Sequence, residues 1–187
     1  MLFVFAAPSG TGKTSIYREI LNDNPGIDFS VSATTRKKRE GEKDGVDYFF
    51  LEKDDFEKRV ANGEFVEYEK IFDDNYYGTL KSFIDGKISE GKDVIFDLDV
   101  KGAMSIKRIY KDKAVLIFIK PPNKEVIKQR LLSRGTESPE TIEKRLARFD
   151  FEMEKINEFN YVVVNDDLKK AINEVQEIIN KYKSGVK

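Results

Sequence analysis

The chain has 187 residues, with 33 Lys and Arg against 34 Asp and Glu, so its formal charge is −1. It contains no Cys and no His. This excludes disulfides, thiolate chemistry, a histidine metal site, a Ser-His-Asp triad and an imidazole base. The balanced charge argues against a protein that coats nucleic acid, since such proteins usually carry a basic excess. Any chemistry must therefore use carboxylates, Lys, Arg, Tyr, hydroxyls, backbone amides and a hard metal ion.

The length predicts one compact domain with room for an insertion. No apolar run approaches the length of a membrane span, and the first residues, MLFVFAAPSG, lack the charged start of a signal peptide. We therefore expect a cytoplasmic protein, a monomer or small homo-oligomer, that binds neither membrane nor nucleic acid.

Apolar strand patterns and helical patterns follow one another along the chain. We predict strands over 2–7, 27–32, 47–51, 64–72, 93–99, 114–122 and 161–165. Helices are predicted from residue 13 to a stop at 22–26, over 53–61, from about 80 to 91, and over 100–109, 124–132, 141–159 and 168–182. Apolar strands that alternate with helices predict an α/β fold, with a parallel sheet covered on both faces. Between 27 and 79 the strands come closer together and alternate polar with apolar residues, which predicts a small inserted antiparallel lobe.

The first predicted strand runs into a phosphate-binding loop, AAPSGTGKTS over residues 6–15. Gly10 and Gly12 leave room for phosphates to approach the backbone, Lys13 can reach the β- and γ-phosphates, and the Thr14 hydroxyl can ligate Mg²⁺. Ala7 replaces the first glycine of the general G-x-x-x-x-G-K-[ST] pattern, which matters only if that position needs a positive φ. The alternative is an ordinary strand-to-helix turn with a lysine at its start.

A carboxylate near such a loop usually comes from an adjacent apolar strand. The run VIFDLD supplies Asp97 and Asp99, which point to one face of a strand because side chains alternate. Asp97 is the candidate for the Mg²⁺ shell, through a water molecule. The alternative is a pair of helix-capping or solvated carboxylates.

Two basic clusters leave several interpretations open. Arg36 and Arg39 lie in TTRKKRE, which fits a solvated surface run, a nucleic-acid patch or a phosphate clamp. Arg130 and Arg134 share one helix face, and Arg145 and Arg148 share another, on either side of the polar break SRGTESPE. This suits a flap that closes over a triphosphate, although surface arginines paired with acids would give the same pattern.

The motifs taken together resemble the guanylate kinase family over about the whole chain. They are APSGTGKT, FSVSATTRKKREGEKDGVDYFF, EFVEYEKIFDDNYYGT, DVIFDLDVKGA, FIKPP, RLLSRGTESPETIEKRL and VVVNDDL. Bacterial members commonly carry Ala at the position of Ala7. The resemblance implies transfer of the γ-phosphoryl of ATP to GMP, giving ADP and GDP, with Mg²⁺. It also implies a single domain, 1–187, with a P-loop three-layer fold. Its core would be 1–32 and 80–187, its GMP-binding lobe about 33–79 and its helical lid about 130–148.

The resemblance also implies roles for individual residues. The ATP site would comprise Ala7, Pro8, Ser9, Gly10, Thr11, Gly12, Lys13, Thr14 and Arg130, with Asn165 and Asp166 near adenine. The GMP site would comprise Arg36, Arg39, Tyr48 and Tyr77 at the phosphate, and Ser32, Glu67, Thr79 and Asp99 at guanine. The catalytic group would be Lys13, Arg36, Asp97, Arg134 and Arg145. Two departures are visible: Lys38 stands where proline is usual, and Lys101 stands where Gln is common.

Guanine recognition by Glu67 has a simple chemical basis, because guanine presents N1–H and N2–H₂ donors on one edge and a carboxylate accepts both. From the strand pattern alone Glu67 would be a solvent-facing acid, and Tyr48 and Tyr77 could equally be core aromatics. Two other functions stay open: a kinase-like module that binds partner peptides without turnover, and a kinase for another acceptor. The intact phosphate loop and the lid arginines favour the enzyme.

Overall fold

The computed structural model of the chain describes residues 1–71, 75–133 and 139–184. Its centre is a five-stranded sheet in the order β2 (Ile27–Phe29), β7 (Asp93–Asp97), β1 (Leu2–Ala6), β8 (Ala114–Lys120) and β9 (Tyr161–Val164). All four neighbouring pairs are parallel. The carboxyl ends of these strands therefore meet at one edge of the sheet, and a crevice beyond such an edge is the usual ligand site of α/β proteins.

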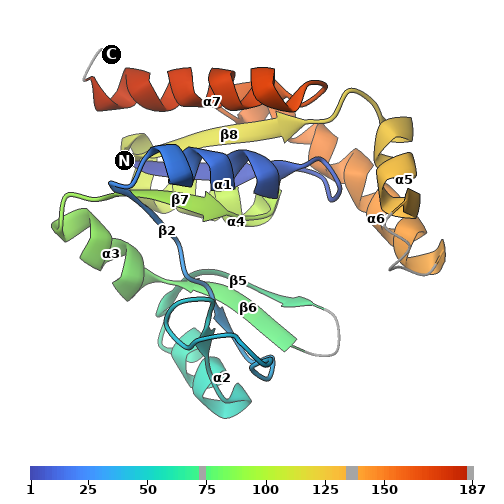
Figure 1. Cartoon of the computed structure of the whole chain (residues 1–187). Helices are drawn as coiled ribbons and strands as arrows, with labels where there is room; N and C mark the ends of the chain where they lie inside the picture. The colour runs from blue at the N-terminus through green and yellow to red at the C-terminus, as the bar shows by residue number, and fades with distance from the viewer. Residues whose placement is uncertain (72–74, 134–138, 185–187) are drawn as a thin grey trace.

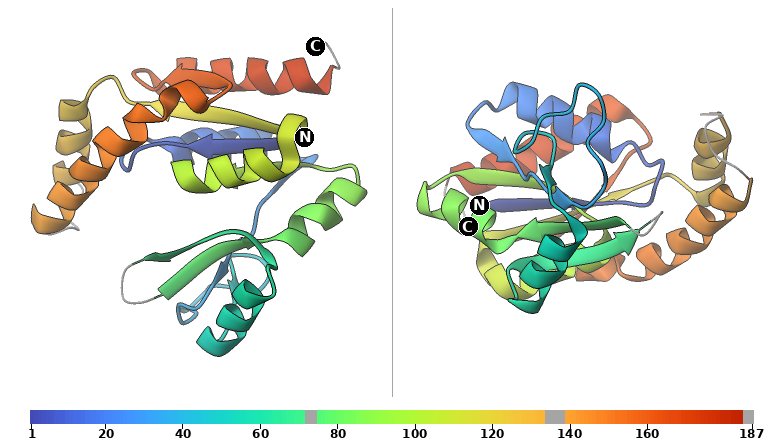
Figure 2. Two further views of the ribbon diagram at one scale, coloured as in Figure 1. Left: turned by 180° about the vertical axis from the view of Figure 1, so that it is seen from behind. Right: turned by 90° about the horizontal axis from the view of Figure 1, so that it is seen from below.

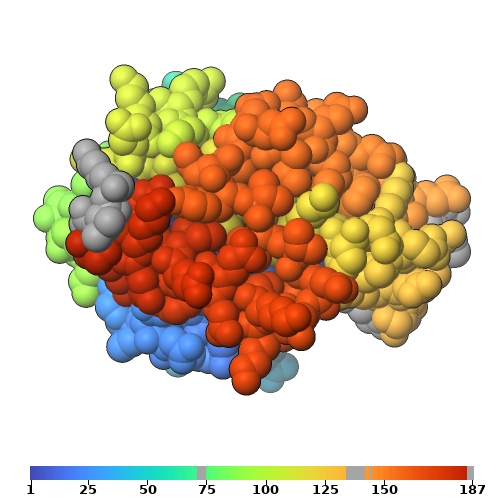
Figure 3. All heavy atoms as spheres, turned by 90° about the horizontal axis from the view of Figure 1, so that it is seen from above, coloured from blue at the N-terminus to red at the C-terminus, as the bar shows by residue number. Residues whose placement is uncertain are grey.

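Helices cover both faces of this sheet, because side chains of β1 alternate between two apolar cores. Phe3 and Phe5 pack under α1 (Lys13–Asp23) and α7 (Leu168–Lys183). Leu2 and Val4 face α3 (Lys81–Ser89) and α4 (Val100–Tyr110). Figure 1 shows α1 and α7 on one side of the sheet and α4 on the other. The view in Figure 3 shows α7 lying beside α1. The prediction of a three-layer α/β core is confirmed.

A second, four-stranded sheet forms the inserted lobe, in the order β4 (Phe49–Phe50), β3 (Ala33–Thr34), β6 (Asn75–Leu80) and β5 (Phe65–Ile71). The pairs β3–β6 and β5–β6 are antiparallel, while the short β4 joins β3 in parallel. The helix α2 (Lys53–Ala61) places Phe56 against Phe65, with ring centroids 4.3 Å apart. The lobe thus has an apolar core of its own.

Helices α5 (Lys124–Ser133) and α6 (Pro139–Glu154) form a third part of the molecule. They pack on each other through Ile127, Leu131, Ile142 and Phe149. The views in Figure 2 show this pair and the lobe as two projections from the core. None of the described helices is long and apolar enough to cross a lipid bilayer.

Several predicted elements are longer than the observed ones. The strand predicted over 27–32 ends at Phe29, because the chain leaves the core sheet there to enter the lobe. The strand predicted over 47–51 is reduced to Phe49–Phe50. The helix predicted over 141–159 ends at Glu154 and is followed by a short 3-10 turn, η3 (Ile156–Glu158). Another 3-10 turn, η2 (Lys111–Lys113), leads into β8. The strand Ile27–Phe29 belongs to the core, so the closely spaced strands of the lobe begin only at Ala33.

Candidate active site

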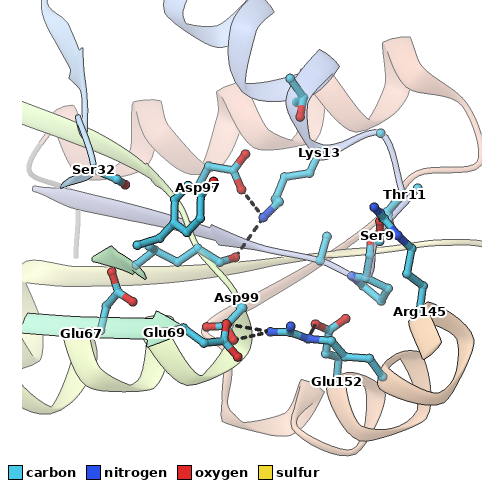
Figure 4. A pocket seen from close by; sticks show the side chains of 18 of the residues that line it. Ser9, Thr11, Lys13, Ser32, Glu67, Glu69, Asp97, Asp99, Arg145 and Glu152 are labelled. Carbon is cyan, nitrogen blue, oxygen red and sulfur yellow. Dashed lines mark hydrogen bonds and ion pairs between the residues drawn. The ribbon is translucent and has the colours of Figure 1, made fainter. Parts of the chain in front are cut away.

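A cavity of about 660 Å³ opens where core, lobe and α6 meet. Its described lining comes from the phosphate loop and the start of α1, from the lobe, from the end of β7 and from α6. These residues are Ala7, Pro8, Ser9, Gly10, Thr11, Gly12, Lys13, Thr14, Ser15, Ser32, Tyr48, Glu67, Glu69, Tyr77, Gly78, Asp97, Leu98, Asp99, Arg145, Arg148 and Glu152. The close view in Figure 4 shows Lys13 and Asp97 at one side of it and Glu67, Glu69 and Asp99 at another.

The phosphate loop follows β1 and ends at the first turn of α1. Gly10 and Gly12 have φ of 85° and 89°, in the left-handed region that favours glycine. A Cβ on Gly12 would lie 2.7 Å from the Asn165 side-chain nitrogen. Ala7 does not have a positive φ, so the missing first glycine brings no backbone strain. The loop therefore presents the N-terminus of α1 to the cavity, where backbone amides favour an anion.

Lys13 is held by β7. Its ammonium group donates a hydrogen bond to the Leu98 carbonyl oxygen at 2.9 Å and forms an ion pair with Asp97. The register of β1 with β7 sets Phe5 opposite Asp97, which brings the strand end to the loop. Sequence reasoning placed both side chains in the site, and the structure brings them into contact.

The donors near Lys13 suit a small hard cation. Thr14 offers a hydroxyl and Asp97 a carboxylate, and oxygen ligands are those that Mg²⁺ prefers. Among the described residues no group of three or more His, Cys, Asp or Glu could hold a metal by itself. An ion here would thus need phosphate and water oxygens as well, which is the usual way in which proteins bind Mg²⁺.

One face of α6 brings three charged residues to the cavity. Arg145 donates a hydrogen bond to the Ser9 hydroxyl. Arg148 contacts Asp99 at 2.5 Å, Glu69 at 3.4 Å and Glu152 at 3.0 Å. Burial raises the pKa of Glu152 to about 7, although Arg148 opposes this shift. The helix thereby joins the phosphate loop, the lobe and the end of β7.

Glu67 lies deep in the lobe side of the cavity. The Thr79 hydroxyl, from the residue paired with it across β5 and β6, donates a hydrogen bond to the Glu67 carboxylate at 2.6 Å. Burial raises the pKa of Glu67 to about 7; the Thr79 bond lowers it, and the charges of Asp99 and Glu69 raise it further. Asp99 itself caps α4 by accepting a hydrogen bond from the Gly102 amide at 2.7 Å.

Tyr48 and Tyr77 line the cavity, and their rings meet edge to face with centroids 6.0 Å apart. Burial raises the pKa of Tyr48. Arg36 lies 5.4 Å from the Tyr48 ring, but its guanidinium is paired with Glu42 at 2.7 Å. Glu42 also accepts a hydrogen bond from the Arg39 backbone amide at 2.8 Å.

A second cavity of about 340 Å³ lies across the phosphate loop, lined by Gly10, Gly12, Ser15, Arg130, Ser133, Asn165, Asp166 and Leu168. Asn165 is buried, and its side-chain amide donates a hydrogen bond to the Thr11 carbonyl oxygen at 2.6 Å. Arg130 donates to the same oxygen at 3.4 Å. Both residues therefore brace the phosphate loop from its outer side.

Comparison with known proteins agrees with this geometry. The family model described as guanylate kinase matches residues 1–182. The chain belongs to the guanylate kinase family. It is 45% identical to a guanylate kinase of Bacteroides thetaiotaomicron, with 97% of this chain and 89% of the relative covered. It is 46% identical to that of Chlorobaculum tepidum, with 97% and 92% covered. The crystal structure of guanylate kinase from Anaplasma phagocytophilum superposes with a TM-score of 0.75 at 27% identity, over 97% of this chain and 85% of that chain.

Most residues that the guanylate kinase resemblance assigns to the site lie around the two cavities. The loop residues 7–14, Ser32, Tyr48, Glu67, Tyr77, Asp97, Asp99 and Arg145 line the first, and Arg130, Asn165 and Asp166 line the second. Arg36 and Arg39 are not among the described lining residues, and Thr79 is fully buried behind Glu67. Arg134 lies outside the described residues. The individual roles stay predictions.

Sequence reasoning missed Glu69 and Glu152, and it placed Arg148 only among the arginines of a flap over the triphosphate, not beside Asp99 and Glu69. A signal existed for each of the two acids. Glu69 is two residues beyond Glu67 on β5, so both point to one face. Glu152 is four residues beyond Arg148 on α6, which also brings side chains together. That these two faces meet across the cavity depends on a contact between residues 79 positions apart, and no local pattern predicts such a contact.

Proposed function

We propose that this guanylate kinase family member is an ATP:GMP phosphotransferase that converts ATP and GMP into ADP and GDP. One observation carries the proposal: a single cavity has the phosphate loop with Lys13 at one end and the partly buried carboxylate of Glu67 at the other. A nucleoside monophosphate whose base reaches Glu67 would direct its phosphate toward the loop.

The lobe end suits guanine. The Glu67 carboxylate would accept N1–H and N2–H₂ together, with Thr79 fixing its position and Ser32 and Asp99 beside it. Adenine offers no matching pair of donors, so AMP would leave a desolvated carboxylate poorly paired. Such a mismatch costs about 2 kcal/mol or more.

The GMP phosphate would lie between Tyr48, Tyr77 and the two arginines of the lobe. Arg36 already lies 5.4 Å from the Tyr48 ring. It would leave its ion pair with Glu42 and bind the phosphate instead, since Arg can bind phosphate through two parallel hydrogen bonds. Arg39 would join it through a change of side-chain conformation.

The loop end would hold the ATP phosphates through backbone amides, Lys13 and Arg145. The acceptor is already an anionic phosphate oxygen, so no general base is needed, and positioning and charge neutralisation are sufficient. Thr14 and, through water, Asp97 would hold Mg²⁺, which neutralises phosphate charge when bound with ATP. Arg134 would contact the transferred phosphoryl group. Asn165, Asp166 and Arg130 would contact ATP.

The division of the single domain 1–187 into a core, a lobe at about 33–79 and a lid at about 130–148 is part of the proposal. Closure of lobe and lid over both substrates would exclude water, which would otherwise accept the phosphoryl group and waste ATP. We place the reaction in the cytoplasm, carried out by a monomer or small homo-oligomer.

The test is ADP formation from Mg-ATP by purified protein, with GMP, AMP, CMP, UMP and dTMP offered in parallel. We expect turnover with GMP on the order of 1–100 s⁻¹ and its loss in Lys13→Met. Circular dichroism should show that this variant keeps the fold. Turnover that prefers another acceptor would replace GMP in the proposal. A folded protein that binds GMP without turning it over would favour the peptide-binding module.

A further inference from the structure

The acids at the lobe end of the cavity need a nearby cation. The described lining of the whole cavity contains the acids Glu67, Glu69, Asp97, Asp99 and Glu152, against the cations Lys13, Arg145 and Arg148. Lys13 is engaged with Asp97, and Arg145 reaches Ser9. Arg148 is thus the described lining cation that pairs with the acids around Glu67.

The contacts of Arg148 join three parts of the molecule. From α6 it reaches Asp99 Oδ2 at 2.5 Å and Glu69 Oε2 at 3.4 Å, and its Nε donates to Glu152 Oε1 at 3.0 Å. Asp99 uses its other oxygen, Oδ1, to cap α4. These two contacts orient the Asp99 carboxylate. Because each carboxylate oxygen can accept two hydrogen bonds, Asp99 can still accept a hydrogen bond from a further donor.

We propose that Arg148 is a positioning residue for the acceptor base: by neutralising Asp99 and Glu69 it keeps the neighbouring Glu67 ionised and aligned for the N–H donors of guanine. The inference rests on the proposed function for the identity of the base. It assigns to this arginine of α6 a part in base recognition, whereas its helix neighbour Arg145 lies at the phosphate loop.

The charged groups around Glu67 act on its pKa. Two neighbouring charges, Asp99 and Glu69, act with burial to raise the Glu67 pKa to about 7. Both are ion-paired with Arg148. The titratable and charged groups that share this cavity are Glu69 of β5, Tyr48 and Tyr77 of the lobe, Asp97, Asp99, Lys13, and Arg145, Arg148 and Glu152 of α6. Removal of Arg148 would leave Asp99 and Glu69 uncompensated and favour protonation of Glu67, which would then accept fewer hydrogen bonds.

The experiment measures GMP binding by calorimetry between pH 6 and 9 in wild type, Arg148→Met and Arg148→Lys, and the Glu67 pKa by carboxyl NMR in the same proteins. In Arg148→Met we expect the Glu67 pKa to rise by about one unit, as expected when a neighbouring opposite charge is lost. At pH 7 a rise of one unit from about 7 would cut the ionised fraction about fivefold, with a matching rise in the GMP Kd. Arg148→Lys should restore most of the wild-type Glu67 pKa and most of the GMP affinity. The affinity for ATP should be unchanged in both variants.

Arg59→Met is the matched control. Arg59 also pairs with two acids, Asp55 at 3.0 Å and Glu64 at 3.5 Å, but lies in the lobe away from the described cavity lining. Its loss should leave the Glu67 pKa unchanged. An unchanged Glu67 pKa in Arg148→Met, or tighter GMP binding by that variant, would overturn the inference. Failure of wild type to bind GMP would instead overturn the proposed function, and with it the role of Arg148 in base recognition.

Discussion

Glu67 is an acid placed where burial disfavours its charge. In the folded chain its pKa is raised to about 7, against an ordinary value of 4.5. Between these two values the folded protein binds more protons than the unfolded protein, so its free energy of unfolding falls as the pH rises through that window. A residue that this site needs in its ionised form therefore destabilises the fold at neutral and alkaline pH.

Glu67→Gln should remove this penalty. The amide keeps an oxygen for the Thr79 hydroxyl, which donates at 2.6 Å in the native chain, but carries no charge. We expect the variant and the wild type to be about equally stable below pH 4.5, and the variant to gain about 3 kcal/mol by pH 8. Urea denaturation at several pH values measures the difference. If the difference stays constant from pH 4.5 to 8, Glu67 titrates like an exposed acid and the description of its environment is wrong.

The β5–β6 hairpin carries Glu67, and its close packing depends on one glycine. A Cβ on Gly78 would lie 2.8 Å from the Glu67 carbonyl oxygen and 2.9 Å from side-chain atoms of Phe65 and Tyr68. Backbone cannot move away as a flexible side chain can. The hairpin therefore has space for Gly78 and not for a larger residue.

Gly78→Ala should cost about 1–3 kcal/mol of stability, as overpacking generally does, and should weaken GMP binding more than ATP binding. Gly86→Ala is the matched control, because Gly86 lies inside α3 with nothing within 4 Å of its added Cβ. It should stabilise the protein by about 0.5–1 kcal/mol. Thermal denaturation of both variants is the measurement, and equal melting temperatures would refute the close packing at Gly78.

Local patterns predicted the elements that have a strong signal of their own. The helix predicted over 53–61 is α2, Lys53–Ala61, and the phosphate loop lies between β1 and α1 as its glycines indicate. The short lobe strand β3 was not predicted, and β4 was predicted only as part of a longer strand over 47–51. Pairing of two residues with another strand leaves no periodicity to detect. The same limit applied to Glu67, since an alternating strand has two faces and the sequence does not say which one is buried.

At the scale of the molecule, the site exists because an insertion and a helix pair meet over one edge of a parallel sheet. The motifs predicted the phosphate end well, since a strand, loop and helix adjacent in sequence build it. The other end depends on contacts between residues far apart, such as Arg148 with Asp99, 49 positions away. For Arg36 the motif predicts a role that its observed contacts do not display. The resemblance assigns Arg36 to the GMP phosphate, whereas in the described structure it is paired with Glu42.

One cavity joins the phosphate loop to Glu67, the carboxylate proposed to bind guanine. The decisive measurement is the ratio of kcat/KM for GMP to that for AMP, at pH 8 in wild type and in Glu67→Gln. We predict a wild-type preference for GMP of at least about a hundredfold, largely lost in the variant through a higher KM for GMP. A wild type that uses AMP as well as GMP, or a variant with an unchanged ratio, would contradict the account.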